Sequence, residues 1–255
     1  MTVRELYTHL SREIPSALSC EWDNDGLMCC PNENAPVRRV LVALDVTLDV
    51  AEKATSEGYD VILSHHPLIF RPLRALDPAD PVAKKVIRLL CAGISVMSFH
   101  TRLDAVEGGV NDVLAEALGL CDVIPFGPDG EAIGRIGSLA SPMSLADFAA
   151  LVKRATGAPL VQAVDAGRPV SRVAVLGGSG SGDAEVARRA GADTYLSGEL
   201  KHDVLTDAPE KGLNLVAAGH FHTEDPVCKR LCALVQEADP SIEIDVTSSN
   251  TVTYC

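Results

Sequence analysis

Five histidines of the sequence gather in three short segments that also contain carboxylates: SHHPLIF (64–70), FHTRLD (99–104) and GHFHTE (219–224). Imidazole and carboxylate groups bind divalent metal ions, and an adjacent pair of histidines is costly to bury without such a partner. A carboxylate that bridges two cations neutralises them and fixes their separation. The pattern predicts a site for two metal ions, with the candidate ligands His65, His66, Asp104, His220 and Glu224.

The other histidines in or near these segments have more than one candidate role. His100 is a candidate for orienting a ligand through a hydrogen bond, and His222 alternates with His220, so it can also face away. Both are candidates for catalytic proton transfer near neutral pH. His202 either lies near the site or begins a helix. A single histidine is more often an ordinary core or surface residue, so the prediction depends on the three segments together.

Two copies of one pattern, residues 38–66 and 171–199, lead into these segments. Aligned without a gap, they share Arg39/Arg172, Val40/Val173, Ala51/Ala184, Ala54/Ala187, Gly58/Gly191, Asp60/Asp193 and Ser64/Ser197. Each copy predicts a strand, a short helix that ends at a glycine, and a second strand. Such units favour parallel strands joined by right-handed crossovers.

Each copy continues into a further helix and strand. The helix from Asp80-Pro81 to Gly93 precedes the strand ISVMSF and then His100, and a helix ending at Gly212 precedes LNLVAA and then His220. Ligands of open α/β sheets bind beyond the carboxyl ends of the strands. We therefore expect an α/β fold of two pseudo-symmetric, interlinked halves with mixed sheets, and a di-metal site in the cleft at the strand ends.

The halves are predicted to meet near GPDGE. The expected ranges are 1–126 and 127–255 for the halves, 127–131 for the junction, 144–156 and 224–236 for further helices, and 242–246 for a last strand in the second half. The sequence leaves open whether the halves interleave. RLDAVEGGVND predicts a helix that starts after Asp104.

Composition excludes several classes of protein. Of the 255 residues 47% are hydrophobic, and no apolar run reaches the roughly 20 residues of a membrane span. The first residues predict an amphipathic helix with a Thr2/Glu5 capping box in place of a signal peptide, so we expect a cytoplasmic protein. The eight cysteines lack zinc-finger spacing, and we expect them to be reduced thiols. A net charge of −13 disfavours nucleic-acid binding.

Several motifs together resemble a known family. HHPLIF, HTRLDAVEGGVND, LGGSGS, SGELKHD, GHFHTE and EWDNDGL are similar to the motifs of the YbgI/Nif-like dinuclear metal-centre proteins, often named GTP cyclohydrolase 1 type 2 homologues. The resemblance implies two interlinked α/β halves, a ring-shaped homohexamer and a di-metal site. It implies that Asp104 and Glu224 bridge the ions, with His65, His66 and His220 as terminal ligands. The chain lacks the inserted domain of longer members, and His222 departs from their final motif.

Nitrogen and carboxylate ligands suit two divalent ions of Zn, Fe, Mn or Co. A bridging water would then be acidified and attack a C–N bond of a small nucleotide-type substrate, as in a GTP cyclohydrolase, or a phosphoester. The stretch LGGSGSGD (176–183) either cradles a phosphate or is a tight turn. The alternatives are a peptidase, a phosphoesterase, and a metal-binding or chaperone protein without turnover.

Two further segments have structural predictions. EWDNDGL forms either a lid or a packed loop. Asp45 and Thr47 are expected to cap the next helix.

Overall fold

The computed structural model describes residues 1–128 and 132–254. The chain divides into two compact units, Met1–Val106 with Cys228–Thr251 and Glu107–Val227 with Val252–Cys255, called here the first and second unit. The units therefore interleave along the sequence. Residues 129–131 of the expected junction, and Cys255, lie outside the described residues.

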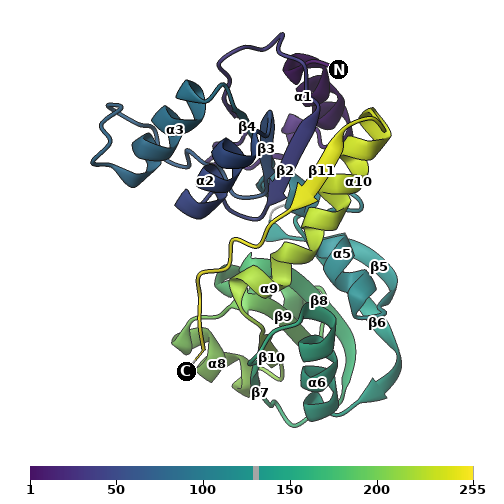
Figure 1. Cartoon of the computed structure of the whole chain (residues 1–255). Coiled ribbons are helices and arrows are strands. Elements are labelled where there is room, and N and C mark those ends of the chain that lie inside the picture. The colour runs from purple at the N-terminus through teal and green to yellow at the C-terminus, as the bar shows by residue number, and fades with distance from the viewer. Residues whose placement is uncertain (129–131, 255) are drawn as a thin grey trace. The chain divides into compact units, whose positions relative to one another are not determined.

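The first unit is built on a mixed sheet with the strand order β1-β4-β3-β2-β11, in which β1 is antiparallel to β4 and the other neighbours are parallel (Figure 1). Its elements are α1 (Val3–Glu13), η1 (Ser16–Leu18), β1 (Gly26–Cys29), β2 (Arg39–Ala43), α2 (Leu48–Glu57), β3 (Val61–Ser64), α3 (Pro81–Cys91), β4 (Ser95–Ser98), α4 (Thr101–Ala105), α10 (Cys228–Ala238) and β11 (Glu243–Val246). The buried side chains of Leu41, Ile62 and Val96 belong to the core that α2 and α3 cover on one face.

The local signals in the sequence explain where these helices begin and end. Thr2 and Glu5 form the predicted capping box of α1. Asp80 caps α3 by accepting from two backbone N–H groups, with Pro81 at the first helical position. Gly58 ends α2 at φ 72°, a left-handed conformation that costs glycine little. These three predictions are confirmed.

The second unit has a mixed sheet with the strand order β5-β6-β8-β9-β10-β7, and its central strands β8, β9 and β10 are parallel (Figure 1). Its elements are α5 (Val110–Ala117), β5 (Cys121–Phe126), β6 (Gly134–Met143), α6 (Leu145–Thr156), β7 (Gln162–Val164), β8 (Val170–Ser179), η3 (Ser181–Asp183), α7 (Ala184–Arg189), β9 (Thr194–Glu199), α8 (His202–Glu210), β10 (Asn214–Ala217), α9 (His220–Glu224) and η4 (Asp225–Val227). Side chains of α5 and α6 form one hydrophobic core with one face of this sheet. Side chains of α7 and α8 form a second core with the other face.

The predicted repeat is present in both sheets with the same register. Val40 pairs with Val61 in the first unit, and Val173 pairs with Thr194, the residues that the gap-free alignment assigns to these positions. The order β2-α2-β3-α3-β4 corresponds to β8-α7-β9-α8-β10. The expected α/β fold of two pseudo-symmetric halves with mixed sheets is confirmed.

His100 and His220 each follow the last strand of their copy, but they do not occupy equivalent positions. The Phe99 N–H donates to Ser64, and the Ala218 N–H donates to the equivalent Ser197. His100 therefore corresponds to Gly219. His100 precedes α4 as its N-cap, whereas His220 is the first residue of α9.

Three other elements differ from the prediction. Asp104 lies inside α4, because the helix starts at Thr101 and the chain resumes a helix only at Val110. The range 224–236 contains the end of α9, the short η4 and most of α10. The strand at 242–246 is β11, which pairs with β2 in the sheet of the first unit. None of the helices in the described ranges has the length and apolar character needed to cross a bilayer.

Candidate metal centre

The candidate ligands of the first unit follow neighbouring parallel strands. His65 and His66 come directly after β3, and His100 comes after the adjacent β4. Asp45 follows β2, on the other side of β3. Because the carboxyl ends of parallel strands meet at one edge of a sheet, the fold gathers these side chains. His65 is fully buried, while His66 and His100 are partly exposed.

All three imidazoles are oriented through their Nδ1 atoms. The Nδ1 of His65 lies 2.9 Å from the carbonyl oxygen of Phe99, that of His66 lies 2.7 Å from Asp45 Oδ1, and that of His100 lies 2.8 Å from Asp23 Oδ1. Oxygen acceptors require the proton on Nδ1, which leaves the lone pair of each ring on Nε2, where it can bind a metal ion or accept a proton.

These imidazoles form a group that could hold a metal ion. One ring nitrogen from each of His65, His66 and His100 lies within 4.8 Å of the others. Asp104 adds a carboxylate, with Oδ1 3.7 Å from the Nε2 of His65. Neutral imidazoles with the second nitrogen hydrogen-bonded, next to a carboxylate, are the ligands that Zn and similar divalent ions take. The residues present therefore fit a metal ion.

The segment that holds His100 and Asp104 is fixed by two aspartates of EWDNDGL. Asp23 accepts from His100 and Thr101, and Asp25 accepts from the His100 N–H and from Arg102 Nε at 3.0 Å. Burial alone would raise the pKa of Asp23, but hydrogen bonds from His100 and Thr101 hold it well below its ordinary value. These contacts favour a packed loop over a lid, although Trp22 itself is exposed, with its ring 6.1 Å from that of His100.

The second unit places His220 between two carboxylates. Its Nε2 lies 3.1 Å from Glu224 Oε2, and its Nδ1 lies 3.3 Å from Glu199 Oε2. Gly178 makes room for this arrangement, because a Cβ built there would overlap the Glu224 carboxylate and come within 3.1 Å of the His220 Nε2. The glycine-rich stretch thus permits the close approach of both candidate ligands to β8.

Comparisons with known proteins agree with this fold. Residues 1–253 match the family described as Duf34/NIF3 (NGG1p interacting factor 3). The chain belongs to this family. A Clostridium perfringens protein named GTP cyclohydrolase 1 type 2 homolog is 32% identical over 97% of this chain and 96% of its own length. A Nostoc protein of the same name is 38% identical over 76% of this chain and 75% of its own length. The crystal structure of a Bacillus cereus protein related to NIF3 superposes with a TM-score of 0.90 at 26% identity, covering 100% and 99% of the two chains.

The family resemblance of the sequence motifs is therefore confirmed. The structure of this Duf34/NIF3 chain also distinguishes the two alternatives for the glycine-rich stretch 176–183. The backbone N–H groups of Gly177, Gly178 and Gly180 donate to side-chain oxygens of Asn111, Thr223 and Ser197, at 2.8, 3.0 and 3.0 Å. Donors engaged in this way do not cradle a phosphate. The structure favours the tight turn.

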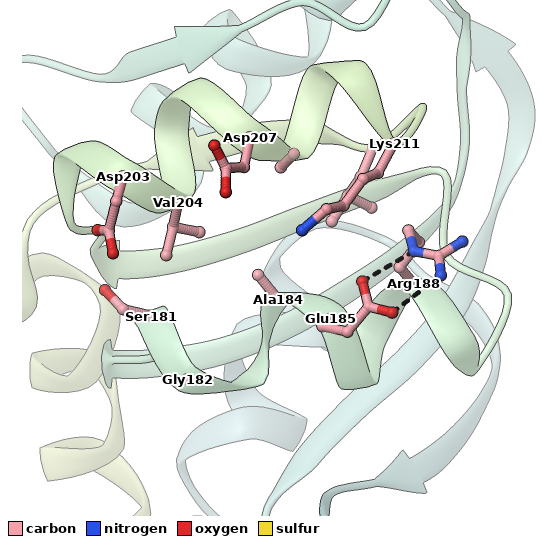
Figure 2. A pocket seen from close by; sticks show the side chains of 11 residues that line it. Ser181, Gly182, Ala184, Glu185, Arg188, Asp203, Val204, Asp207 and Lys211 are labelled. Atoms are coloured by element: carbon pink, nitrogen blue, oxygen red, sulfur yellow. Dashed lines mark hydrogen bonds and ion pairs between the residues drawn. The ribbon is translucent and has the colours of Figure 1, made fainter.

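A pocket lies between η3-α7 and α8 of the second unit (Figure 2). Its cavity volume is about 120 Å³. Glu185 binds Arg188 through two contacts of 2.9 Å, so this guanidinium is already neutralised. Asp203 and Asp207 face the pocket alongside Lys211, and the carboxylates thus outnumber the basic groups of its wall. This pocket does not suit a polyphosphate.

A second pocket borders His220. Its wall includes Glu199 and Gly219 at the ends of β9 and β10, together with Gln162, Leu160 and Tyr254, and its cavity volume is about 310 Å³. Glu199 also contacts the His220 ring, so the pocket adjoins a candidate metal ligand. A mostly apolar wall with a few polar groups is typical of sites for small molecules.

The remaining histidines lie apart from the groups of candidate ligands found among the described residues. His222 packs 5.5 Å from the Phe221 ring and 6.3 Å from the Tyr254 ring. His202 is exposed and begins α8, the alternative that the sequence had allowed. Thr47 caps α2 as expected, but Asp45 binds His66 and Ser249 and leaves the cap to Thr47.

Proposed function

We propose that the protein is a metal-dependent hydrolase that uses water to break a C–N bond in a small nucleotide-type substrate. In this proposal two divalent ions are held by His65, His66, Asp104, His220 and Glu224. The observation that carries the proposal is the group of three imidazoles in the first unit, because each ring is oriented by an oxygen acceptor at Nδ1. Packing alone does not require that orientation in three neighbouring histidines.

The chemistry of the ligands sets the choice of metal. Imidazole nitrogens and carboxylate oxygens suit Zn, Fe, Mn or Co. When bound, such ions polarise a substrate and lower the pKa of coordinated water toward neutrality. In the second unit, Gly178 lets Glu224 and His220 approach β8, which supports their assignment as ligands.

The protein itself supplies proton transfer and a place for the substrate. His100, with its proton held on Nδ1, presents Nε2 as the atom that accepts a proton from the reacting groups. His222 is the second candidate for this role, from the second unit. The pocket beside His220 offers an amide from Gln162, a carboxylate from Glu199 and the ring of Tyr254 to a planar, polar substrate.

The names of the relatives support a C–N bond as the target, since two of them are called GTP cyclohydrolase 1 type 2 homologues. A phosphoesterase or peptidase on the same ligands is the nearest alternative, and it gains nothing from the glycine-rich stretch, whose N–H groups are engaged. The second alternative is a protein that binds or delivers metal without turnover.

We also propose the homohexamer that the family resemblance implies, which native mass spectrometry tests directly.

Metal content is the decisive measurement. The protein is purified without affinity tag or chelator, and its metal is determined by elemental analysis next to Asp104→Ala and the exposed control Asp207→Ala. We expect about two ions per chain in the wild type and in the control, as a two-metal site requires, and most of them lost in Asp104→Ala. The metal-loaded proteins are then incubated with GTP and other nucleotides, and products are identified by mass spectrometry.

The outcomes separate the alternatives. Turnover of GTP that Asp104→Ala abolishes supports the hydrolase. Two ions without turnover of any nucleotide support the metal-binding protein, and turnover of phosphoesters or peptides supports the other enzymes. No metal after reconstitution with Zn, Mn and Fe contradicts the proposal.

A further inference from the structure

The two oxygens of the Asp23 carboxylate have different donors. Oδ1 accepts from the Nδ1 of His100 at 2.8 Å. Oδ2 accepts from the backbone N–H of Thr101 at 3.0 Å and from its hydroxyl at 2.6 Å. The side chain of Asp23 is completely buried, so water does not compete for these contacts. One carboxylate thus satisfies three donors of the segment that precedes Asp104.

This arrangement determines where the proton of His100 lies. An ionised carboxylate only accepts hydrogen bonds, so the His100 Nδ1 carries the proton and Nε2 keeps its lone pair. The three donors from His100 and Thr101 that surround the carboxylate favour its ionised form. His100 belongs to the group with His65 and His66, so the lone pair is available within the candidate metal centre.

We infer that Asp23 is a positioning residue that holds His100 in the Nδ1–H tautomer and so keeps Nε2 as a proton acceptor. The tautomer follows from the contacts alone. Its use in catalysis rests on the proposed function, in which Nε2 takes the proton from the attacking water. A carboxylate behind the imidazole also stabilises the imidazolium that forms when the proton arrives.

Asp23→Asn reverses the tautomer in this account. The side-chain amide that this substitution introduces has one oxygen and one NH₂ group. The amide oxygen stays with the two donors of Thr101, because an NH₂ group there would face two other donors. The NH₂ group then points at the His100 Nδ1, which must accept, and the proton of His100 moves to Nε2.

Glu21→Gln is a matched control in the same loop. Glu21 is exposed, and its replacement is the same change from carboxylate to amide. This variant loses the same charge but leaves the contacts of Asp23, and so the tautomer of His100, unchanged.

The experiment is ¹⁵N magic-angle-spinning NMR of Zn-loaded protein labelled at histidine, with the His100 signals assigned by comparison with His100→Gln. We expect the proton on Nδ1 in the wild type and in Glu21→Gln, and on Nε2 in Asp23→Asn. A wild-type His100 protonated on Nε2 overturns the inference even if a variant fails to fold. An Asp23→Asn protein with the wild-type tautomer overturns it as well.

Steady-state kinetics on the substrate found for the wild type adds a second measurement. Asp23→Asn is expected to lower kcat by roughly 10²- to 10⁴-fold, the usual contribution of general acid–base catalysis, with metal content and KM unchanged. Glu21→Gln should keep most of the kcat. Equal kcat losses in both variants overturn the positioning role. If the wild type has no hydrolase activity, the proposed function fails while the tautomer is still decided by NMR.

Discussion

Asp60 and Asp193 accept equivalent backbone hydrogen bonds in the two halves of the repeat. Asp60 Oδ2 accepts from the N–H groups of Arg38 and Arg39, at 2.7 and 3.0 Å. Asp193 accepts from the N–H groups of Ser171 and Arg172, at 3.1 and 2.7 Å. Each aspartate directly precedes one strand and fixes the start of its neighbour, so the same contact sets the register of β2–β3 and of β8–β9.

Replacing either aspartate by alanine should destabilise its own unit. Loss of the acceptor leaves two backbone donors without a partner, which costs about 1–3 kcal/mol. Asp193 also accepts from the Thr194 hydroxyl at 2.8 Å, so Asp193→Ala should have the larger effect. Chemical denaturation measures the loss, and hydrogen exchange locates it in β2–β3 or in β8–β9. The control Asp207→Ala should stay within about 0.5 kcal/mol of the wild type, and equal losses in all three variants would contradict this reasoning.

The repeated strand–helix–strand units were predictable because their signals are local. Periodic apolar residues, Gly58 and the cap at Asp80 depend on neighbours a few residues away. The equal register also follows from a gap-free alignment, since equal spacing preserves the pairing of Val40 with Val61 in the second copy.

The features that sequence reasoning missed depend on distant contacts. Asp23 binds His100 across 77 positions, and no local pattern distinguishes that aspartate from a surface residue. The pairing of β11 with β2 likewise joins residues from opposite ends of the chain. The role of Asp45 was missed because an aspartate before a helix usually caps it, and its bond to His66 required the positions of β2 and β3.

Gly178→Ala should damage the candidate centre of the second unit. Gly178 has φ +66°, and an alanine Cβ there overlaps the Glu224 carboxylate. We expect a loss of about 1–2 kcal/mol from the left-handed backbone and a lower metal content. Gly182→Ala, in the same stretch, meets no atom within 4 Å and should retain both stability and metal. Elemental analysis and thermal unfolding compare the two, and unchanged metal content in Gly178→Ala would exclude a role for Glu224 at its present position.

Asp45→Ala should weaken metal binding without removing a ligand. Asp45 Oδ1 holds the His66 Nδ1 at 2.7 Å, and loss of such a partner typically lowers metal affinity by about 10- to 100-fold. Competition titration with a chromogenic Zn chelator measures the affinity. Asp49→Ala, an exposed residue in the first turn of α2, provides the control. Equal affinities for the wild type and Asp45→Ala would show that His66 needs no orientation.

Arg102→Met should be strongly destabilising. Arg102 is fully buried, its Nε is 3.0 Å from Asp25 Oδ2, and the side chain of Asp25 is only 6% exposed. Removal of the cation leaves a buried carboxylate unpaired, at a cost of about 3–5 kcal/mol. Urea denaturation of Arg88→Met, whose pair with Glu52 is exposed, should show a change below about 1 kcal/mol. Similar midpoints for the two variants would refute the prediction.

Cys29 should resist alkylation at pH 8, whereas the exposed Cys91 and Cys121 should react. Burial, with a smaller contribution from Cys30, raises the pKa of the Cys29 thiol to about 11, so little thiolate forms. The pKa of this thiol in the folded protein lies above its ordinary value of 9.0. Its contribution to the free energy of unfolding is therefore fully present below pH 9 and is lost as the pH rises through about 11. Peptide mass spectrometry after iodoacetamide treatment measures the labelling. Labelling of Cys29 as fast as Cys91 would contradict its burial.

Trp22 is the only tryptophan of the chain, and its exposed indole stands 6.1 Å from the His100 ring and 6.2 Å from that of Phe70. Its emission therefore reports on one place in the molecule, next to the histidines that are the candidate ligands. A paramagnetic ion such as Co²⁺ arriving there would quench the indole, and a stopped-flow fluorimeter could follow the arrival without any label. The protein thus contains its own optical probe, with which the order and rate of metal loading can be timed.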